Sequence, residues 1–382
     1  MVRNGPPVPD EQASPQRLAE ILASLEGIER IRQAAGDVPA YLVGGAVRDL
    51  LLGDRRVDVD IVVEGDASEV AARLGGESIS HERFGTAKVR AGELVADLAA
   101  ARSESYPHPG ALPEVRPGTL AEDLARRDFT INAMAIPLQG EPRLIDPHGG
   151  RGDLEHGLLR ALHERSFVDD PTRALRAARY AARLGFDPEA ETERLIRETD
   201  LGTVSEDRRE AELYKLASEP RARRGFELLD EWGLVPLDEQ RGNLIDLVAD
   251  LLSEPPWSEV TQRPAAVLAA ARGEVGQAPR LASHEPTRPS DGVEMARRAS
   301  GVELAIARAL GTKWLDEYVD EWRHVGLEIT GEDLLAAGVP EGPAVGRGLA
   351  AALARKLDGE IQGRDEELAA ALEAARGAGE PT

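Results

Sequence analysis

Two aspartates separated by one residue form the pair best suited to hold a metal ion. Asp58 and Asp60 lie in VDVDIVV, residues 57–63, a β-branched run that predicts a strand. Side chains two positions apart on a strand point the same way, so both carboxylates can hold the same pair of divalent ions. Oxygen ligands suit Mg²⁺, and two such ions activate an attacking hydroxyl and stabilise a leaving pyrophosphate. An isolated Asp-x-Asp, by contrast, is usually a solvated strand face.

A glycine pair precedes these aspartates, with twelve residues between them. Gly44 and Gly45 predict a tight turn that opens a short helix over 46–52. Backbone N–H groups at such a turn approach a triphosphate closely, and the helix N-terminus adds positive potential. Arg48 lies one turn into that helix and can reach the same phosphates. A Gly-Gly turn alone is weak evidence, but its conjunction with the aspartate pair, in this order, is much more specific.

These residues need a sheet to position them. Further strands are expected over 41–43, 87–89 and 94–98, and helices over 15–35, capped by Ser14, and 67–74. From about residue 154 the spacing is helical almost throughout, most clearly over 170–185, 188–199, 205–217 and 219–232. The predicted fold class is therefore α+β: a mixed α/β head followed by an all-helical neck, body and tail.

Composition narrows the class of protein. The chain has 382 residues, 42% of them hydrophobic and none of them cysteine. It is long enough to bury a core, while disulfide scaffolds, Cys-ligated zinc, iron–sulfur clusters and a thiol nucleophile are excluded. No apolar run of about 18 residues predicts a membrane-spanning helix. Because the N-terminus carries no secretory pattern either, a cytoplasmic location is expected.

The formal net charge of −23 argues against a protein that simply coats nucleic acid. The charge is uneven along the chain. Residues 1–150 carry 16 basic and 24 acidic residues, residues 151–224 carry 15 and 16, and residues 225–382 carry 15 and 29. The middle segment is the least acidic, so contact with a polyanion is expected to depend on residues 160–225.

The segment YLVGGAVRDLLLG, residues 41–53, followed by VDVDIVV resembles the head of class II tRNA nucleotidyltransferases (CCA-adding enzymes) and bacterial poly(A) polymerases. RRDFTINAMA at 126–135 is very specific to this group. Further blocks match the family in order, at 96–106, 109–135, 144–154 and 167–186, and the tail 327–349 resembles the C-terminal part of some bacterial members. The resemblance implies a nucleotidyltransferase head like that of polymerase β.

The resemblance also implies roles for three residues near the aspartate pair. Asp97, on the predicted strand 94–98, is the candidate third carboxylate, as metal ligand or general base. A solvent-facing strand aspartate is an equally weighted alternative. Arg127 is implied to contact the nucleotide and Asp128 its ribose, which would favour NTP over dNTP. Judged from the residues alone, Asp128 is better explained as the N-cap of an apolar helix.

Asp170 and Arg173 are implied to act as a protein template for the incoming base. An aspartate accepts from the amino group of cytosine or adenine, and an arginine donates to the ring nitrogen beside it. Guanine and uracil present a carbonyl instead. Asp170 and Pro171 also predict a cap and a first helical residue. Arg176 and Arg179 continue an arginine stripe toward the triphosphate or the primer end, although a salt-bridged, solvated helix is the plainer interpretation.

Three features of the sequence leave details of nucleotide and tRNA recognition open. The family often has Glu-Asp before this proline, whereas this sequence has Asp169-Asp170, and the shorter Asp169 has less reach toward Arg173. The Pro- and Gly-containing segment 98–125 is either the loop that in the family helps to switch from C to A addition, or a plain connector. The segment 331–346 predicts two short helices around a Gly/Pro turn, for tRNA phosphate contact or for simple packing.

The predicted function is template-independent addition of C and A, from CTP and ATP, to the tRNA 3′ end, with two Mg²⁺ ions and release of pyrophosphate. The expected partners are the tRNA 3′ end with its acceptor and T arms, and nucleoside triphosphates. CC-adding, A-adding and poly(A)-polymerising enzymes share the head residues and stay open as alternatives. A non-catalytic RNA-binding protein is a remote one, because the acidic pair is intact. The expected domains are an N-terminal extension (1–36), a catalytic head (37–150), a base-recognising neck (151–225) and a tRNA-binding body and tail (226–382).

Overall fold

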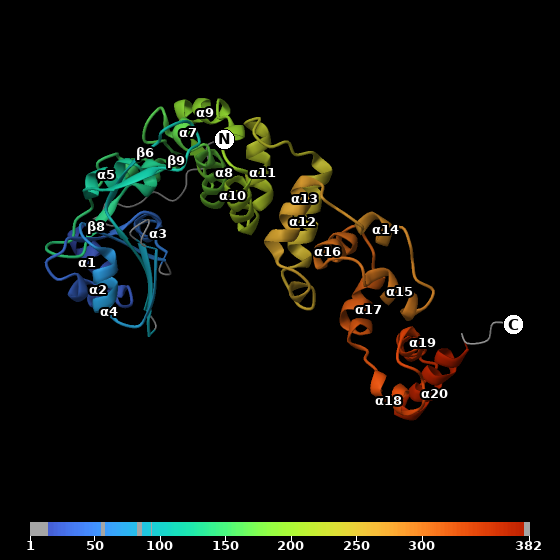
Figure 1. Ribbon diagram of the computed structural model, residues 1–382. Coiled ribbons are helices and arrows are strands. Elements are labelled where there is room, and N and C mark those ends of the chain that lie inside the picture. The colour runs from blue at the N-terminus through green and yellow to red at the C-terminus, as the bar shows by residue number, and fades with distance from the viewer. Residues whose placement is uncertain (1–13, 55–57, 82–85, 93, 378–382) are drawn as a thin grey trace. The chain divides into compact units, whose positions relative to one another are not determined.

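The computed structural model describes residues 14–54, 58–81, 86–92 and 94–377 (Figure 1). The chain divides into two compact units, Met1–Pro236 and Leu237–Thr382. The first unit holds the mixed α/β head and the helices that follow it, and the second is helical. The predicted α+β class is confirmed.

A six-stranded mixed sheet forms the centre of the head. Its strand order is β3-β4-β5-β2-β1-β8, with β2 and β5 parallel and the other neighbours antiparallel. The strands are β1 (Ala40–Val43), β2 (Val59–Val63), β3 (Glu77–His81), β4 (Thr86–Ala91), β5 (Leu94–Ala100) and β8 (Ala135–Pro137). The predicted strands are confirmed, and β3 and β8 were not predicted. The parallel β2–β5 pair places side by side two acidic strands that lie far apart in sequence.

Helices cover this sheet. Helix α4 begins where Asp66 accepts from the backbone N–H of Ser68 at 2.8 Å, as a capping aspartate does. It packs against β4 and β5 and beside α2, whereas α3 packs against β1. The helices of the head are α1 (Pro15–Ser24), α2 (Ile28–Ala35), α3 (Gly45–Leu51), α4 (Ala67–Leu74), α5 (Leu120–Ala125) and α6 (Gly150–His156).

The single helix predicted over 15–35 is wrong in one respect. Ser14 does cap it, accepting from the N–H of Arg17 at 3.3 Å, but the helix breaks between α1 and α2. Leu25 is extended, and Gly27 has φ of +74°, a conformation that L side chains rarely adopt. The two halves therefore form separate helices.

The segment after Arg127 is not the apolar helix predicted to follow Asp128. A 3₁₀ turn, Thr130–Asn132, leads directly into β8, which pairs with β1 at the edge of the sheet. Met134, Ala135 and Ile136 are fully buried there. The apolar run is therefore buried as an edge strand, and Asp128 caps no helix.

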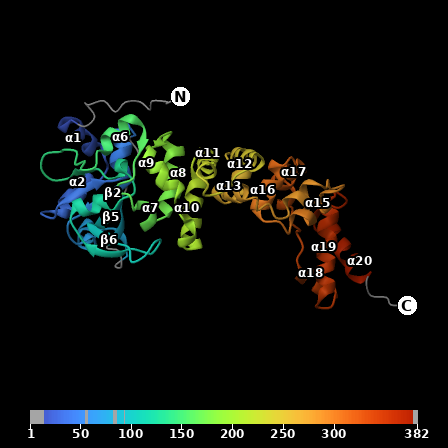
Figure 2. The ribbon, with the colours of Figure 1, turned by 90° about the horizontal axis from the view of Figure 1, so that it is seen from above.

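The helical part of the first unit agrees closely with prediction. Helix α8 packs against both α10 and α11 (Figure 2). The elements that follow the sheet are the hairpin β6 (Arg102–Ser105) and β7 (Glu114–Pro117), the short pair β9 (Leu158–Leu159) and β10 (Asp187–Pro188), and the helices α7 (Ser166–Asp169), α8 (Thr172–Leu184), α9 (Ala190–Arg197), α10 (Glu206–Ser218) and α11 (Ala222–Glu231).

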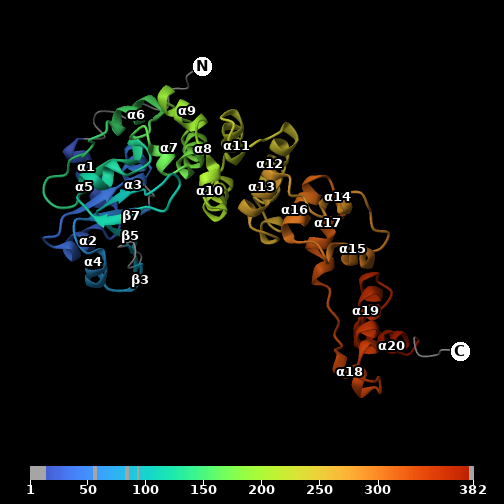
Figure 3. The same ribbon diagram turned by 45° about the horizontal axis from the view of Figure 1, so that its top comes forward.

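The second unit consists of α12 (Glu239–Leu251), α13 (Arg263–Arg272), α14 (Ala278–Ala282), α15 (Pro289–Ala296), α16 (Gly301–Ala309), α17 (Trp314–Asp320), α18 (Gly331–Ala336), α19 (Pro343–Leu357) and α20 (Gly363–Arg376). The last three form a small cluster around Leu334, Ala352 and Ala371 (Figure 3). Helices α18 and α19 are the two predicted around the Gly/Pro turn at 331–346. No helix among the described residues is long and apolar enough to cross a membrane.

Candidate active site

A cavity of about 1200 Å³ in the first unit brings the predicted site residues together. Its walls come from β2, β5, α3, α8, α10 and the segment before β8. The predicted residues that line it are Gly45, Arg48, Asp58, Asp60, Asp97, Arg127, Asp128, Asp170, Arg173, Arg176 and Arg179. Gly44 lies directly before Gly45, as the N-cap of α3. Residues spread over more than a hundred positions in sequence thus share one space.

Three carboxylates lie on the sheet side of the cavity. Asp58 immediately precedes β2, and Asp60 on β2 stands opposite Asp97 in the register of β2 with β5. Burial and the neighbouring charges of Asp97 and Asp58 raise the pKa of Asp60 to about 6. The half-exposed Asp97 lies 3.5 Å from the ammonium of Lys88. Among the described residues no three acidic, His or Cys side chains are gathered as a ready-made metal site, so the cavity offers paired carboxylates rather than a closed cage.

The glycine turn lies beside these carboxylates and opens α3. Gly44 has φ of +69° and ψ of −134°, which glycine adopts freely and other residues do not. A Cβ atom on Gly44 would lie 2.5 Å from Nη1 of Arg127. The turn therefore requires glycine for its backbone and for the close approach of Arg127.

Arg48 is buried on the first turns of α3 instead of extending freely into solvent. Its guanidinium donates to Asp49 at 2.8 and 2.9 Å and to the side-chain oxygen of Asn132 at 2.6 Å. It also lies 5.2 Å from the ring centroid of Tyr180. These partners fix the position of Arg48 on the cavity wall, three residues after Gly45.

A buried acid that was not predicted, Asp123, holds both arginines of the RRD segment. Its two carboxylate oxygens accept from Arg126 at 2.6 Å and from Arg127 at 2.8 Å. These arginines hold the pKa of Asp123 below its usual range despite its burial. The spacing of three and four residues within one helical turn was the available indication of this pairing.

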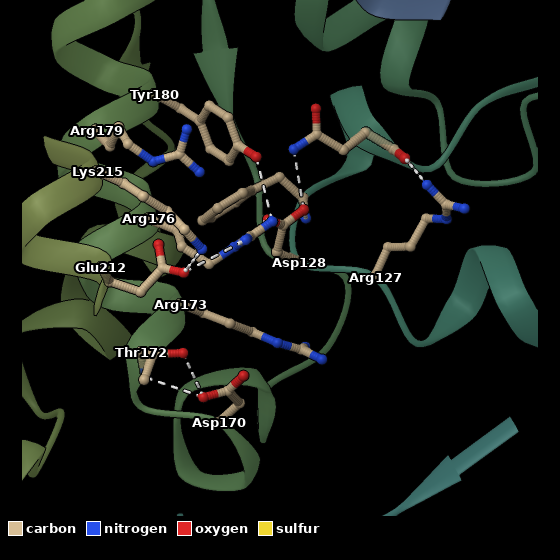
Figure 4. A network of polar contacts seen from close by, with 12 residues as sticks. Arg127, Asp128, Asp170, Thr172, Arg173, Arg176, Arg179, Tyr180, Glu212 and Lys215 are labelled. Atoms are coloured by element: carbon tan, nitrogen blue, oxygen red, sulfur yellow. Dashed lines mark hydrogen bonds and ion pairs between the residues drawn. The ribbon is translucent and has the colours of Figure 1, made fainter. Parts of the chain in front are cut away.

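Asp128 is buried and bound to Arg176, from α8 (Figure 4). One oxygen accepts from Nε of Arg176 at 2.8 Å, and the other accepts from the amide of Asn132 at 3.0 Å. Burial opposes ionisation, but the charge of Arg176 outweighs it and holds the pKa of Asp128 well below its usual range. The prediction that Asp128 caps a helix is therefore wrong. Its carboxylate forms a buried ion pair with Arg176 on the cavity wall.

Tyr180 and Glu212 line the same wall and were also not predicted. The Tyr180 ring has three arginine side chains around it, with Arg179 4.5 Å and Arg176 5.6 Å from its centroid. Glu212, on α10, accepts from Lys215 at 2.7 Å. One Glu212 oxygen and the Nε of Arg179 are buried and have no hydrogen-bond partner. The arginine stripe on α8 therefore faces the cavity, so a solvated helix face is wrong for Arg173, Arg176 and Arg179. Arg176 and Arg179 do form ion pairs, with Asp128 and Glu219.

Asp170 is held at the entrance to α8. One of its oxygens accepts from the backbone N–H of Thr172 at 3.1 Å, from the Thr172 hydroxyl at 2.6 Å and from Arg208 at 2.9 Å. The helix begins at Thr172, one residue after the predicted start at Pro171. Arg173 follows in the first turn and is only 5% exposed. Arg208 was not predicted, because nothing in the local sequence relates α10 to Asp170.

The segment 98–125 is more regular than a single loop. It contains the end of β5, the β6–β7 hairpin and the whole of α5. Its connecting piece, 106–113, contacts the helical part: the Gly110 carbonyl accepts from Arg208 at 2.9 Å. Arg208 thus joins this connection to Asp170, which lines the cavity.

Comparison with known proteins identifies relatives of this chain. The family model of the poly(A) polymerase head domain matches residues 40–160. A CC-adding tRNA nucleotidyltransferase of Deinococcus radiodurans is 38% identical over 352 residues, which cover 88% of this chain and 89% of that protein. An A-adding tRNA nucleotidyltransferase of Aquifex aeolicus is 50% identical over 174 residues, which cover 44% of this chain and 21% of that protein.

Solved structures resemble the chain over nearly its whole length. A CCA-adding enzyme in complex with ATP is 29% identical, covers 94% of this chain and 95% of its own, and has a TM-score of 0.71. A CCA-adding enzyme in complex with CTP is 28% identical, covers 97% of both chains and has a TM-score of 0.69. These proteins share the fold of both units.

Proposed function

This chain belongs to the tRNA nucleotidyltransferase family, and from that premise we propose that it completes tRNA 3′ ends by adding C and A from CTP and ATP. The observation that carries the proposal is that one cavity holds both the carboxylates of the sheet and the Asp170–Arg173 pair. The first group suits phosphoryl chemistry, and the second suits selection of a base with an amino group. The similar CCA-adding enzymes with ATP and CTP support these substrates.

Asp58 and Asp60 would hold Mg²⁺, which commonly binds through one or two carboxylates together with substrate phosphates. The donor set fits, because all ligands are carboxylate oxygens. Burial first, and then the negative charges of Asp97 and Asp58, raise the pKa of Asp60, and a bound cation would compensate those charges. Bound Mg²⁺ would stabilise the charge that develops on the phosphates and on pyrophosphate. Asp97 is placed to complete this group or to accept the proton of the tRNA 3′-hydroxyl.

The chain's own cationic and backbone groups would orient the triphosphate. The N–H of Gly45 lies at the start of α3 beside the cavity, whereas that of Gly44 already donates to the Met134 carbonyl at 3.2 Å. Arg127 lies against Gly44, and Arg48 lies against Gly45. Held there, the α-phosphate would face the attacking 3′-hydroxyl, with pyrophosphate leaving on the opposite side. Asp128 would contact the ribose, and its pairing with Arg176 would fix its orientation.

Base selection would be the task of Asp170 and Arg173. Three donors occupy one oxygen of Asp170, and its other oxygen is available to accept from the amino group of cytosine or adenine. Uracil or guanine would place a carbonyl against that oxygen and leave both groups unsatisfied, at a cost of about 1–3 kcal/mol. Arg176 and Arg179 would lie nearer the triphosphate or the primer end.

Addition of CC alone is the second candidate. The relative that matches over most of both chains is a CC-adding tRNA nucleotidyltransferase. An enzyme of that kind would use the same carboxylates and the same template pair. The two candidates differ only in whether the nucleotide pocket accepts ATP after two C additions.

The test is nucleotide incorporation, with Mg²⁺, on three tRNAs: one lacking the CCA end, one ending in CC and one carrying the full CCA. CTP and ATP are supplied separately and together. We expect CC and then a single A, with no addition to the complete end. Incorporation of C only would select the second candidate, A only or a long A tract would contradict CCA addition, and no incorporation on any tRNA would refute the proposed activity.

A further inference from the structure

The guanidinium of Arg173 is held by neutral acceptors. It donates to the Ser166 hydroxyl at 2.8 Å, to the backbone carbonyl of Arg126 at 2.7 Å and to the Tyr106 hydroxyl at 3.5 Å. These acceptors come from α7, from the end of α5 and from the residue after β6. Because Arg173 is almost completely buried, these contacts determine where its charge points.

Asp169, the acid that replaces the more common Glu before Asp170, does not contribute to this arrangement. Its carboxylate pairs with Arg165 at 3.0 Å, within α7. No hydrogen bond or ion pair joins it to Arg173, although the structure describes both residues. The contacts that hold Arg173 therefore come from elsewhere in the chain.

Tyr106 is itself oriented by a buried acid. Its hydroxyl donates to Glu104 at 3.0 Å, which leaves the oxygen lone pairs to face Arg173. Glu104 in turn accepts from Arg102 and Arg126, each at 2.9 Å. Burial, followed by the charge of Glu104, raises the pKa of Tyr106 to about 12 despite the nearby Arg173. The phenol therefore stays protonated and accepts from Arg173 as a neutral group.

The number of donors on Arg173 suits its role as a template. A guanidinium has five N–H donors, and the three acceptors leave two for a ligand. Cytosine presents two ring-side acceptors, N3 and O2, beside its amino group. Both donors of Nη2 and one donor of Nη1 are engaged, so the two that remain are on Nε and Nη1 and do not form a parallel pair. One of them can donate to a ring acceptor while the remaining Asp170 oxygen accepts from the amino group, provided that the guanidinium does not rotate.

We infer that Ser166 and the Glu104–Tyr106 pair are positioning residues that hold Arg173 for base selection, in place of Asp169. The inference rests on the proposed function, because it concerns how the same site discriminates among bases. Removal of one neutral acceptor is expected to weaken discrimination by about 3–10-fold, because the other two acceptors still hold the charged guanidinium. Removal of two is expected to weaken it by at least about 10-fold.

The experiment measures kcat/KM for CTP and for UTP on a tRNA that lacks the CCA end. The variants are Tyr106→Phe, Ser166→Ala and the double variant, with Asp169→Ala as the matched control. Tyr106→Phe removes one hydroxyl and keeps the packed ring, and Ser166→Thr restores the hydroxyl that Ser166→Ala removes. Circular dichroism and thermal melting confirm that each variant folds.

We expect the double variant to lower the CTP:UTP ratio at least about 10-fold, mainly through a higher KM for CTP. Asp169→Ala should keep the ratio within about twofold of wild type, and Ser166→Thr should recover most of the loss. A double variant with the wild-type ratio would overturn the inference, and so would an Asp169→Ala variant that loses discrimination as severely.

Equilibrium binding of CTP and UTP without tRNA separates this inference from the proposed function. A protein that prefers CTP in binding but transfers nothing would refute the transfer activity. The positioning roles would then be judged by the same variants in the binding measurement. A wild-type protein with no preference for CTP in either measurement would overturn both.

Discussion

At the scale of single residues, the cavity holds carboxylates of like charge close together, and a bound cation would relieve their repulsion. Asp60 stands opposite Asp97 across two neighbouring strands, with Asp58 nearby, and its pKa is raised by burial first and by these neighbours second. An acid whose pKa is higher in the folded protein than in the unfolded chain favours folding most at low pH. Its contribution to stability is lost as pH rises from about 4 toward 6. At neutral pH, ionised Asp60 therefore lowers the stability of the folded protein, but the resulting charge pattern suits a bound cation.

We expect Asp60→Asn to abolish transfer and to stabilise the metal-free protein. Loss of several kcal/mol of charge stabilisation predicts a decrease of more than about 100-fold in incorporation. Removal of the repulsion should raise the melting temperature, at about 2–4 °C for each kcal/mol recovered, when melts are recorded with a chelator at pH 7.5.

Asp37→Asn is the control for this prediction, because Asp37 is exposed and does not line the cavity. Asp37→Asn should change neither nucleotide incorporation nor the melting temperature. A metal-free Asp60→Asn protein that melts below wild type would contradict the view that ionised Asp60 is destabilising.

At the scale of elements, the turn between β1 and α3 sets where the arginines of the cavity can lie. Gly44 has a positive φ, and a Cβ atom there would lie 2.5 Å from Nη1 of Arg127. Either feature alone disfavours any residue other than glycine at this position. Asp123, on α5, then fixes Arg127, which follows this helix. A strand–turn–helix connection therefore positions an arginine that comes from a different part of the chain.

Gly44→Ala is expected to destabilise the fold by about 1–2 kcal/mol through its backbone conformation and also to displace Arg127. We predict an increase in the KM for both CTP and ATP, measured by incorporation. Gly53→Ala is the matched control, because Gly53 also has a positive φ, of +94°, but a Cβ there would contact nothing. It should show a similar loss of stability with unchanged KM values. Equal KM changes in both variants would assign the effect to backbone strain alone.

Within the last helices of the second unit, one buried acid joins three segments. Glu367 on α20 is fully buried and accepts from Lys356 at 2.6 Å and from the backbone N–H groups of Glu328 and Ile329. Although burial opposes ionisation, these donors hold the pKa of Glu367 below its usual value. A depressed pKa stabilises the fold above the unfolded value, near 4.5. That contribution is lost as pH falls through the folded pKa.

Glu367→Gln should therefore lower the free energy of unfolding of this unit at pH 7 by about 1–3 kcal/mol, the contribution of hydrogen bonds to a charged group. The stability of the Glu367→Gln variant should depend less on pH between 5 and 3 than the stability of wild type does. Thermal melts followed by circular dichroism across this range test both points, with the exposed Glu332→Gln as control. A parallel pH dependence in the variant and wild type would rule out Glu367 as the group responsible.

At the scale of the whole molecule, a chain of net charge −23 has to bind a polyanion. Many arginines of the segment 160–225 already have acidic partners. Exposed or half-exposed ion pairs of this kind join Arg194 to Glu191, Arg197 to Glu193, Arg223 to Glu227 and Arg224 to Glu231, at 2.5–2.8 Å. Exposed pairs of this kind contribute little to stability, so phosphates can compete for the arginines at small cost.

We predict that tRNA binding depends steeply on salt. Six or more phosphate contacts would weaken affinity by roughly 10³-fold or more between 50 and 200 mM monovalent salt. Filter binding or fluorescence anisotropy of a tRNA lacking the CCA end measures the slope. Binding that stays flat over this range would contradict an electrostatic interface and would leave base and ribose contacts as the source of affinity.

The sequence by itself determined the chemistry of the site and most of its local elements. The spacing of Asp58 and Asp60 on a β-branched run, and the Gly44-Gly45 turn before a helix, are local features. They depend on backbone geometry within a few residues. The helical periods after residue 154 are local in the same sense, and the helices α8 to α11 fall where they were predicted.

Only the tertiary structure decided which side chains meet. Asp128 looks like a helix cap in sequence, but it binds Arg176, and Arg173 is held by Tyr106 and Ser166 instead of the adjacent Asp169. Such partners are joined by sheet register and helix packing, which bring together residues far apart in the chain. Because the strength of each pairing depends on burial created by the whole unit, residue spacing alone carries no information about it.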